Sequence, residues 1–461
     1  MDAALEATVQ RQLERIARQT QAEARVPALQ VAIYRGDREP WTFQIGQSGT
    51  QRSLDAATTF RIGSITKTFT AVLVMQCRDA GLLELDDTLG AHLDVPAFGS
   101  ATIRRLLSHT SGVQREPHGD IWTPEGVSPD AKRLIAELAQ AEQVLPPGRR
   151  FHYSNLAYAL LGQLVAKIHG VPWLEIASDR VFRPLGLTSL SAQPGPQSAI
   201  GYQVDAYSDH AKPERILDLD GTEAAAQLWG TAADLAKWGA FLADPATVDP
   251  TGAVLNALTV EEMRWPVTLT NDARWAIGFG LGLMVQPQGD WTVHIGHDGA
   301  MPGFLASAQG RRGPGVPKAL GAAALGSSGT ADEIIGLPHQ LLSAAVELDP
   351  ADIAPWEPGT PAPERYQSVL GRWWAEGFEH VFGWHNNALN ARMVGAPAQM
   401  PPAIFAETAE TNVLRTVSGR EVGEQLRIIR DRDGNAVELR WATYSYTRDQ
   451  RTFDGFLTAR G

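Results

Sequence analysis

A serine and a lysine three residues apart open a long apolar stretch of this chain. Ser64 and Lys67 lie in FRIGSITKTFTAVLVMQ, residues 60–76, whose apolar residues cover most of a helix surface. Residues three apart share one helix face, so the ammonium of Lys67 can reach the Ser64 hydroxyl. Because a buried lysine loses its proton easily, the pair predicts a nucleophile and its base. The alternative is an N-cap serine and a lysine that extends toward solvent.

Two further polar motifs follow along the chain. Tyr153, Ser154 and Asn155 form a loop just before a strongly apolar helical stretch. His297-Asp298-Gly299 closes a predicted strand, before Ala300 and a Pro-Gly pair at 302–303. Taken alone, the first motif is also typical of a helix cap and the second of a loop that leaves a sheet edge.

Together and in this order, the three motifs resemble those of the penicillin-recognising serine hydrolases. This superfamily includes class C β-lactamases, DD-peptidases, D-aminopeptidases and β-lactamase-like carboxylesterases. Its signature is Ser-x-x-Lys, then Tyr-x-Asn, then Lys-Thr-Gly or His-x-Gly on a strand beside the site. LLSHTSG (106–112), RPLGLTSL (183–190) and GTAADLAKWGAFL (230–242) also look like family landmarks. The resemblance covers roughly residues 5–347.

The resemblance implies a role for each motif residue. Ser64 would attack a carbonyl and become acylated, and Lys67 would take its proton or polarise Tyr153. Tyr153 would carry a proton to the leaving group, which requires neighbouring cations to lower its pKa from about 10. Asn155 would hold the acyl amide of the substrate and orient Lys67. The backbone N–H groups of Ser64 and Ala300 would form the oxyanion hole, with no metal and no cofactor.

The third motif departs from Lys-Thr-Gly and bears on the substrate. His297 is mostly neutral at pH 7 and replaces the lysine charge only in part. Asp298 either faces the site, where it would favour a cationic amine, or points away from it. With Asn155, we take His297, Asp298, Gly299 and Ala300 as substrate-binding residues. β-Lactams are then poor substrates at most, and an ester, an amide or a D-amino-acid-containing peptide is the better candidate.

Several alternatives stay open. A β-lactamase or an acyltransferase of the same fold would use the same acyl-enzyme, and a catalytically silent relative would use the fold for binding or as a scaffold. His109, His118, His152 and His294 suggest a metal site, but His294 and His297 are three apart on a predicted strand and point to opposite faces. The chain has no Gly-x-Ser-x-Gly elbow for a Ser-His-Asp triad.

The pattern around the motifs predicts an α+β fold. Leu5, Val9, Leu13 and Ile16 recur at helical spacing, and residues 28–45 form a hairpin. A mostly helical region follows to about residue 245, strands resume near 276, and a last helix ends near Leu348. We expect an antiparallel sheet flanked by helices with an all-α subdomain inserted, which by resemblance is the β-lactamase/transpeptidase-like fold, as domain 1–347.

A different pattern follows. Residues 348–365 contain five prolines and are typical of a semi-rigid linker. In 366–461, Val437, Leu439 and Trp441 alternate with charged residues after an Asp-Gly turn. We expect a small all-β, barrel-like C-terminal domain, which resembles the lipocalin-like appendages of some relatives.

Composition limits the partners and the location. The 461 residues carry a net charge of −12 and no basic run, which argues against nucleic acid. No apolar stretch reaches 18 residues, so we expect no membrane span. The single Cys77 permits no disulfide framework, and the first residues lack a signal-peptide pattern. We therefore expect a cytoplasmic enzyme for a small-molecule or short-peptide substrate, with homo-oligomerisation left open.

Overall fold

The computed structural model describes residues 5–49, 53–123, 125–271, 273–289, 291–353 and 355–450. The chain forms two compact units, Met1–Asp352 and Ile353–Gly461. The division falls after Asp352, within the segment predicted as a linker. Residues 451–461, the last part of the predicted C-terminal domain, lie outside the described residues.

An eight-stranded antiparallel sheet forms the centre of the first unit. Its strand order is β2-β1-β12-β11-β10-β9-β8-β7, so strands from both ends of the unit meet where β1 pairs with β12. The strands are β1 (Ala28–Tyr34), β2 (Trp41–Gly46), β7 (Thr268–Leu269), β8 (Gly278–Phe279), β9 (Met284–Gly289), β10 (Thr292–Met301), β11 (Phe304–Arg312) and β12 (Leu320–Gly326). The predicted hairpin at 28–45 is confirmed as β1 and β2.

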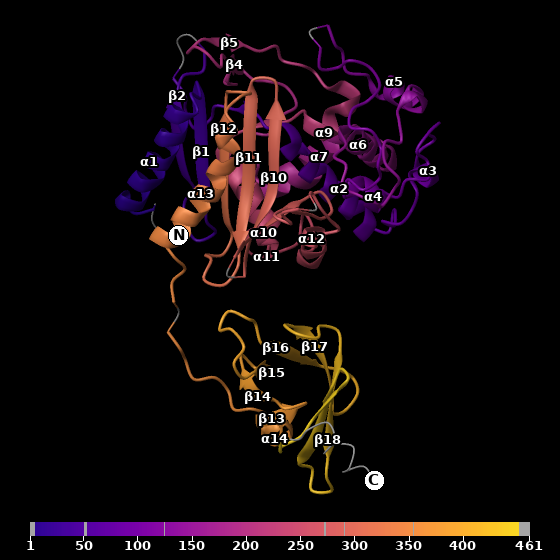
Figure 1. The fold of residues 1–461 in the computed structure, drawn as a ribbon, viewed down its shortest axis with the longest axis vertical. Helices are drawn as coiled ribbons and strands as arrows, with labels where there is room; N and C mark the ends of the chain where they lie inside the picture. Colours follow the sequence, from indigo (N-terminus) through magenta and orange to yellow (C-terminus); the bar gives the residue numbers. More distant parts are fainter. Residues whose placement is uncertain are drawn as a thin grey trace. The chain divides into compact units, whose positions relative to one another are not determined.

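Helices cover both faces of this sheet. On the face turned to the viewer in Figure 1 lie α1 (Ala7–Glu23) and α13 (Glu333–Leu348), whose apolar side chains form one core with β1 and β12. On the other face α10 (Ala232–Ala243) packs closely on β11, because Gly239 of the helix and Gly310 of the strand have no side chains there. The predicted first helix and the helix that ends near Leu348 are confirmed.

The helical region between β2 and β7 carries two of the three motifs. Helix α2 (Thr66–Asp79) is buried on nearly all sides. Helix α6 (Asn155–His169) is capped at its N-terminus by Ser154, whose hydroxyl accepts the Ala157 N–H, and at its C-terminus by Gly170, whose φ is 73°. The remaining helices of the unit are α3 (Leu89–His92), α4 (Ile103–Leu107), α5 (Ala131–Ala136), α7 (Trp173–Ala177), α8 (Arg183–Leu185), α9 (Glu223–Ala226), α11 (Pro245–Val248) and α12 (Ala257–Arg264), the short 3₁₀ helices η1 (Gly63–Ile65), η2 (Leu138–Gln140) and η4 (Asp220–Thr222), and the π-helix η3 (Ser178–Phe182). The remaining strands are β3 (Phe60–Arg61), β4 (Tyr202–Val204), β5 (Ala211–Pro213) and β6 (Trp229–Gly230).

A turn at 280–283 separates β8 from β9. The structure corrects one detail of the predicted strands, because the His-Asp-Gly motif does not close its strand. Strand β10 continues through Ala300 to Met301, since residues 297–301 keep their pairing with β11.

The second unit is a nearly closed antiparallel barrel that follows α14 (Glu364–Gln367). Its eight strands pair in chain order, and a bridge from Trp374 to Thr447 joins the two ends of the sheet. The interior is filled by side chains that include Trp373, Phe382 and Trp441. The strands are β13 (Gly371–Ala375), β14 (Phe378–His385), β15 (Ala388–Met393), β16 (Ala403–Glu407), β17 (Val413–Ser418), β18 (Gln425–Arg430), β19 (Ala436–Trp441) and β20 (Tyr444–Tyr446).

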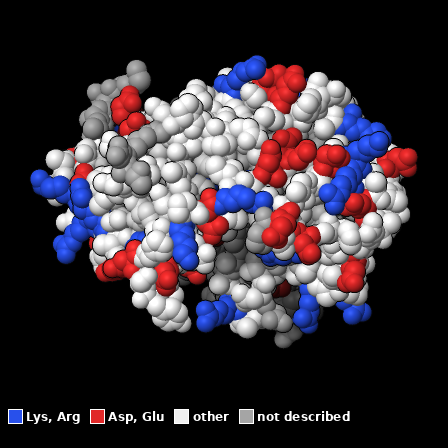
Figure 2. All heavy atoms as spheres, turned by 90° about the horizontal axis from the view of Figure 1, so that it is seen from above, with Lys and Arg blue, Asp and Glu red and all other residues white. Residues whose placement is uncertain are grey.

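The surface charge and the apolar character of the helices bear on nucleic-acid and membrane partners. On the face seen from above in Figure 2, Lys and Arg side chains lie interspersed with Asp and Glu among wide uncharged areas. Within the described residues, no helix combines the length and the apolar character needed to cross a bilayer.

Arg448 joins the two ends of the barrel, which leads to a stability prediction. Its guanidinium lies 3.8 Å from the ring centroid of Trp373 and donates to the carbonyls of Arg372 at 2.9 Å and Leu370 at 3.1 Å. Arg448→Ala removes these contacts and should lower the free energy of unfolding of this unit by about 2 kcal/mol. Urea denaturation of the full chain measures it. The exposed Arg432 in the turn after β18 is the control, and equal midpoints for Arg448→Ala and Arg432→Ala would contradict the prediction.

Candidate active site

Ser64 and Lys67 lie in contact at the start of α2. Ser64 sits in the turn η1, just before the helix itself, since α2 begins at Thr66. The Nζ atom of Lys67 lies 3.0 Å from the Ser64 Oγ and donates to the carbonyl of Ala225 at 2.8 Å. Lys67 is fully buried. Burial holds its pKa well below the ordinary value, with Glu116 opposing this effect and Arg115 adding to it. The amine beside Ser64 is therefore readily available in its neutral form.

Tyr153 lies beside this pair, but its pKa is shifted in the direction opposite to the expected one. Its ring lies 4.9 Å from the Nζ of Lys67. Burial raises the pKa of Tyr153 above its ordinary value, and a hydrogen bond with Ser64 and the charge of Arg115 only partly oppose this. The requirement that neighbouring cations lower this pKa is not met, because Lys67 itself loses its charge more easily than usual. Tyr153 is thus a neutral phenol that can donate a proton.

His109, from the LLSHTSG landmark, supports the Tyr153 loop from behind. It is completely buried, its Nδ1 accepts the backbone N–H of Ser154 at 3.0 Å, and its carbonyl accepts the N–H of His152 at 2.7 Å. Its ring centroid lies 4.3 Å from that of Tyr153. The histidine that suggested a metal ligand in the sequence thus fixes a loop.

Asn155 is the first residue of α6. Its side chain donates a hydrogen bond to Glu116, an acidic residue of the site that none of the three sequence motifs contains. Its Nδ2 donates to Glu116 Oε1 at 2.6 Å, whereas the side-chain bonds of Lys67 go to Ser64 and Ala225. Burial raises the pKa of Glu116, opposed by hydrogen bonds from Asn155 and Trp122 and by the charges of Lys67 and Arg115. The only signal for Glu116 in the sequence is its place, four residues after the LLSHTSG landmark.

The third motif places its histidine and its aspartate on opposite faces of β10. His297 faces the site with its ring centroid 6.1 Å from that of Tyr153, and burial lowers its pKa to about 3. Asp298 shares a face with Ser307 and Gln309 of β11, which donate to its carboxylate at 2.7 and 3.2 Å. Of the two predicted orientations of Asp298, the one that points away from Ser64 is found. Burial raises its pKa to about 6.

His294 lies on the same face as Asp298, as the alternation along the strand predicts. Its Nδ1 lies 2.6 Å from the Nδ1 of His339 in α13, away from His297. Among the described residues, no group of three or more His, Cys, Asp or Glu is placed to hold a metal ion.

Two glycines let the η1 segment that carries Ser64 and strand β10 approach each other closely. A Cβ on Gly299 would lie 1.9 Å from the carbonyl oxygen of Ile62 and 3.3 Å from the Ser64 nitrogen. A Cβ on Gly63, whose φ is 52°, would lie 2.8 Å from the Ala300 nitrogen. The backbone nitrogens of Ser64 and Ala300 thus lie on neighbouring segments, as an oxyanion hole requires.

Ser64, Tyr153, Asn155 and the His-Asp-Gly motif line one cavity of about 820 Å³. The sheet contributes residues of β8, β9 and β10, and the helical region contributes Ser64 and the Tyr153 loop. Its walls are mainly apolar and aromatic, which suits a bulky apolar substrate group. The lining residues are Ser64, Arg115, Glu116, Trp122, Phe151, Tyr153, Asn155, Ala226, Thr270, Ile277, Phe279, Met284, His297, Asp298, Gly299, Ala300, Met301, Leu305, Asp332 and Ile335.

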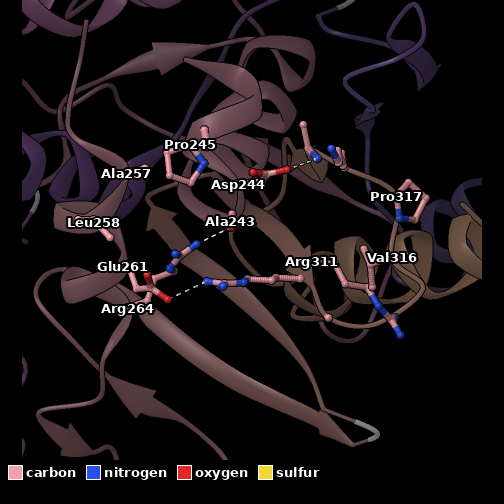
Figure 3. Close-up of a pocket in the computed structure, with 15 residues that line it drawn as sticks. Ala243, Asp244, Pro245, Ala257, Leu258, Glu261, Arg264, Arg311, Val316 and Pro317 are labelled. Atoms are coloured by element: carbon pink, nitrogen blue, oxygen red, sulfur yellow. Dashed lines mark hydrogen bonds and ion pairs between the residues drawn. The ribbon is translucent and has the colours of Figure 1, made fainter. Parts of the chain in front are cut away.

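A second cavity of about 320 Å³ lacks this chemistry (Figure 3). Several of its charged groups have partners within the protein. Arg264 donates to the carbonyl of Ala243, Arg312 lies 3.5 Å from Glu261, and Asp244 accepts a backbone N–H of the chain. None of the three sequence motifs contributes a residue to its lining.

Comparisons with known proteins agree with this geometry. The sequence matches the Beta-lactamase family over residues 13–312, and a domain of unknown function (DUF7586) over residues 362–448. Penicillin-binding protein 4 of Amycolatopsis lactamdurans is 30% identical over 318 residues, which are 65% of this chain and 81% of that protein.

Solved structures share the fold. A D-stereospecific amidohydrolase from Streptomyces sp. has a TM-score of 0.58 and 23% identity, over 74% of this chain and 98% of its own. An octameric penicillin-binding protein homologue from Pyrococcus abyssi has a TM-score of 0.59 and 22% identity, over 95% and 99%. The three motifs, the sheet with its helices and the family match together show that the chain belongs to the β-lactamase family of penicillin-recognising serine hydrolases.

Proposed function

We propose that this chain is a serine hydrolase that cleaves an ester, an amide or a D-amino-acid-containing peptide through an acyl-enzyme on Ser64. The contact between the Ser64 Oγ and the Lys67 Nζ at 3.0 Å supports this proposal most directly. A fully buried lysine that is easily deprotonated is suited to accept the hydroxyl proton as the oxygen attacks.

The reaction then runs in two halves. In the first, the proton of Ser64 passes to Lys67, the Oγ bonds to the substrate carbonyl carbon, and the backbone N–H groups of Ser64 and Ala300 stabilise the negative oxygen. Tyr153 donates its proton to the leaving group and recovers one from the ammonium of Lys67, so the acyl-enzyme forms with no net proton change. In the second half a water oxygen bonds to the acyl carbon, the ester bond to the Ser64 Oγ breaks, one proton of the water returns to this Oγ, and the acyl group leaves as a carboxylic acid.

The third motif favours amides and esters over β-lactams. His297 lacks a positive charge near neutral pH, since its pKa is lowered to about 3, and it cannot supply the cation that a lysine there offers to a substrate carboxylate. Acyl transfer instead of hydrolysis would share the first half of the reaction and differ only in the second nucleophile.

We propose that the C-terminal unit is a separate domain. We propose a hydrolase domain over residues 1–347, a linker over 348–365 and a lipocalin-like domain over 366–461. The barrel pairing in chain order supports the last assignment. Its interior is filled by its own side chains, which favours a structural or partner-binding role over a ligand cavity.

Substitution of the three motif residues tests the function. Ser64→Ala should abolish hydrolysis of p-nitrophenyl acetate at the site, Lys67→Met should lower kcat/KM by about 10³-fold, and Tyr153→Phe by about 10²-fold. Steady-state hydrolysis measures these losses. The exposed lysine control Lys212→Met should match the wild type. Wild-type rates in Ser64→Ala or Lys67→Met would overturn the proposed mechanism.

The depressed pKa of Lys67 predicts the pH dependence. Because the neutral amine is the base, the rate at which a fluorophosphonate labels Ser64 should fall as pH decreases through the Lys67 pKa. The midpoint should lie well below the ordinary lysine value of 10.5. Labelling followed by intact mass from about pH 5 to about pH 10 measures it. A rate that rises only near the ordinary lysine pKa would contradict the assignment of Lys67 as the base.

A further inference from the structure

We propose that the second cavity of the first unit is a binding site for an organic phosphate ester, in which Arg264 holds the phosphate with Arg312 beside it (Figure 3). The cavity has a volume of about 320 Å³, and both arginines line it. Arg264 is the last residue of α12 and Arg312 the last residue of β11. The site is separate from the cavity at Ser64 and goes beyond the proposed hydrolysis.

Arg264 brings a guanidinium into the interior with only one of its nitrogens occupied. The residue is 9% exposed. Its Nη1 donates to the carbonyls of Leu242 and Ala243 at the end of α10, and Figure 3 shows the bond to Ala243. The Nε and Nη2 atoms donate to no atom of the described residues and remain open to solvent. Because the rest of the side chain is enclosed, these N–H groups open into the cavity that Arg264 lines.

The free edge of this guanidinium fits two oxygens of one anion. The N–H groups of Nε and Nη2 lie in one plane and point the same way, which is the geometry that binds phosphate or carboxylate with two parallel hydrogen bonds. The acids of the lining have other partners, because Glu261 lies 3.5 Å from Arg312 and Asp244 accepts the Ala319 N–H at 3.0 Å. A buried cation that contacts only carbonyls gains from an anion at its free edge.

The charges of the lining favour an anion with more than one negative charge. The whole chain has a net charge of −12, but four basic and two acidic residues line this cavity. The guanidinium of Arg311 donates to Ser343 of α13 at 2.9 Å, so its charge is directed to that helix. The other charged residues of the lining are Arg264, Arg312 and Lys318 against Asp244 and Glu261.

Arg264 keeps its charge at neutral pH and lies within reach of a second cation. Its pKa is lowered to about 10, chiefly by burial and further by the charge of Arg312, whereas Glu261 and Asp244 oppose the shift. An anion between the two guanidinium groups would relieve their repulsion. The ion pair of Arg312 with Glu261 offers little resistance, since the side chains are 50% and 55% exposed and such a pair is weak.

The apolar part of the lining favours an organic group on the phosphate. Leu258, which is 74% exposed, lines the cavity together with Pro245, Val316 and Pro317. These side chains offer apolar surface beside the guanidinium, as expected for a ligand with a charged group and an apolar group. Such a phosphate ester is either a soluble metabolite or the headgroup of a phospholipid.

Strand β11 separates this site from the active-site cavity. Arg312 at its end pairs with Val293, whereas Phe304 at its start pairs with Met301, which lines the cavity at Ser64. Eight residues of extended strand span roughly 25 Å. A phosphate on Arg264 therefore does not contact Ser64, and its binding can be measured independently of hydrolysis.

Titration calorimetry of the full chain with phenyl phosphate tests the site. Benzoate is the matched probe, because it has the same ring and only one negative charge, whereas phenyl phosphate carries two at about pH 8. The wild type should bind phenyl phosphate at least about tenfold more tightly than benzoate. Arg264→Gln should weaken phenyl phosphate binding at least about tenfold and Arg312→Gln at least about threefold.

Arg15→Gln is the control, since it removes the same charge from the exposed side of α1, and it should bind as the wild type does. Arg312 lies on the exposed rim, so Arg312→Gln decides if Arg264→Gln does not fold. Equal affinity for phenyl phosphate in the wild type and in each folded variant would overturn the site. Benzoate that binds as tightly as phenyl phosphate would overturn the assignment of a phosphate.

Vesicles distinguish the two sources of the phosphate. Co-sedimentation is measured with phosphatidylcholine vesicles that contain phosphatidic acid and with phosphatidylcholine alone. Sedimentation that requires phosphatidic acid and is lost in Arg312→Gln supports the site with a lipid headgroup as its ligand. Binding of phenyl phosphate without sedimentation supports the site with a soluble ester. Absence of both in the wild type would overturn the proposal.

Discussion

Burial of the Lys67 amine against the Ser64 hydroxyl is the constraint on which the rest of the site depends. In water a lysine near pH 7 is charged and cannot accept a proton. In this chain Lys67 is completely buried, and the carbonyl of Ala225 and the hydroxyl of Ser64 provide its polar contacts. The same burial keeps Tyr153 neutral. The proposed base and the proposed proton donor thus lie beside the proposed nucleophile, each in the protonation state that its proposed role requires.

The fold positions this arrangement through close backbone contact. The turn that carries Ser64 approaches β10 where Gly63 and Gly299 leave no room for a side chain. The central sheet keeps β10 in register through its long pairing with β11. The Tyr153 loop is fixed separately, by His109 from behind and by the cap of α6. Three segments far apart in the sequence therefore meet around one cavity.

The contacts of the site that could be predicted are those set by the spacing of residues within one helix or strand. Ser64 and Lys67 were predictable because a helical spacing of three brings two side chains together, and the opposite faces of His294 and His297 follow from strand alternation. Glu116 was not, because a loop brings it to Asn155 and no periodicity marks that approach. The pKa of Tyr153 was expected to fall, but the sequence does not reveal that burial outweighs the neighbouring cation.

The most direct test of the central claim is the intact mass of the protein quenched during reaction with p-nitrophenyl acetate. An acyl-enzyme on Ser64 predicts a mass gain of one acetyl group in the wild type, located on the peptide that contains Ser64, and no gain in Ser64→Ala. A gain of equal size in Ser64→Ala, or an acetyl group located elsewhere in the wild type, would contradict the account.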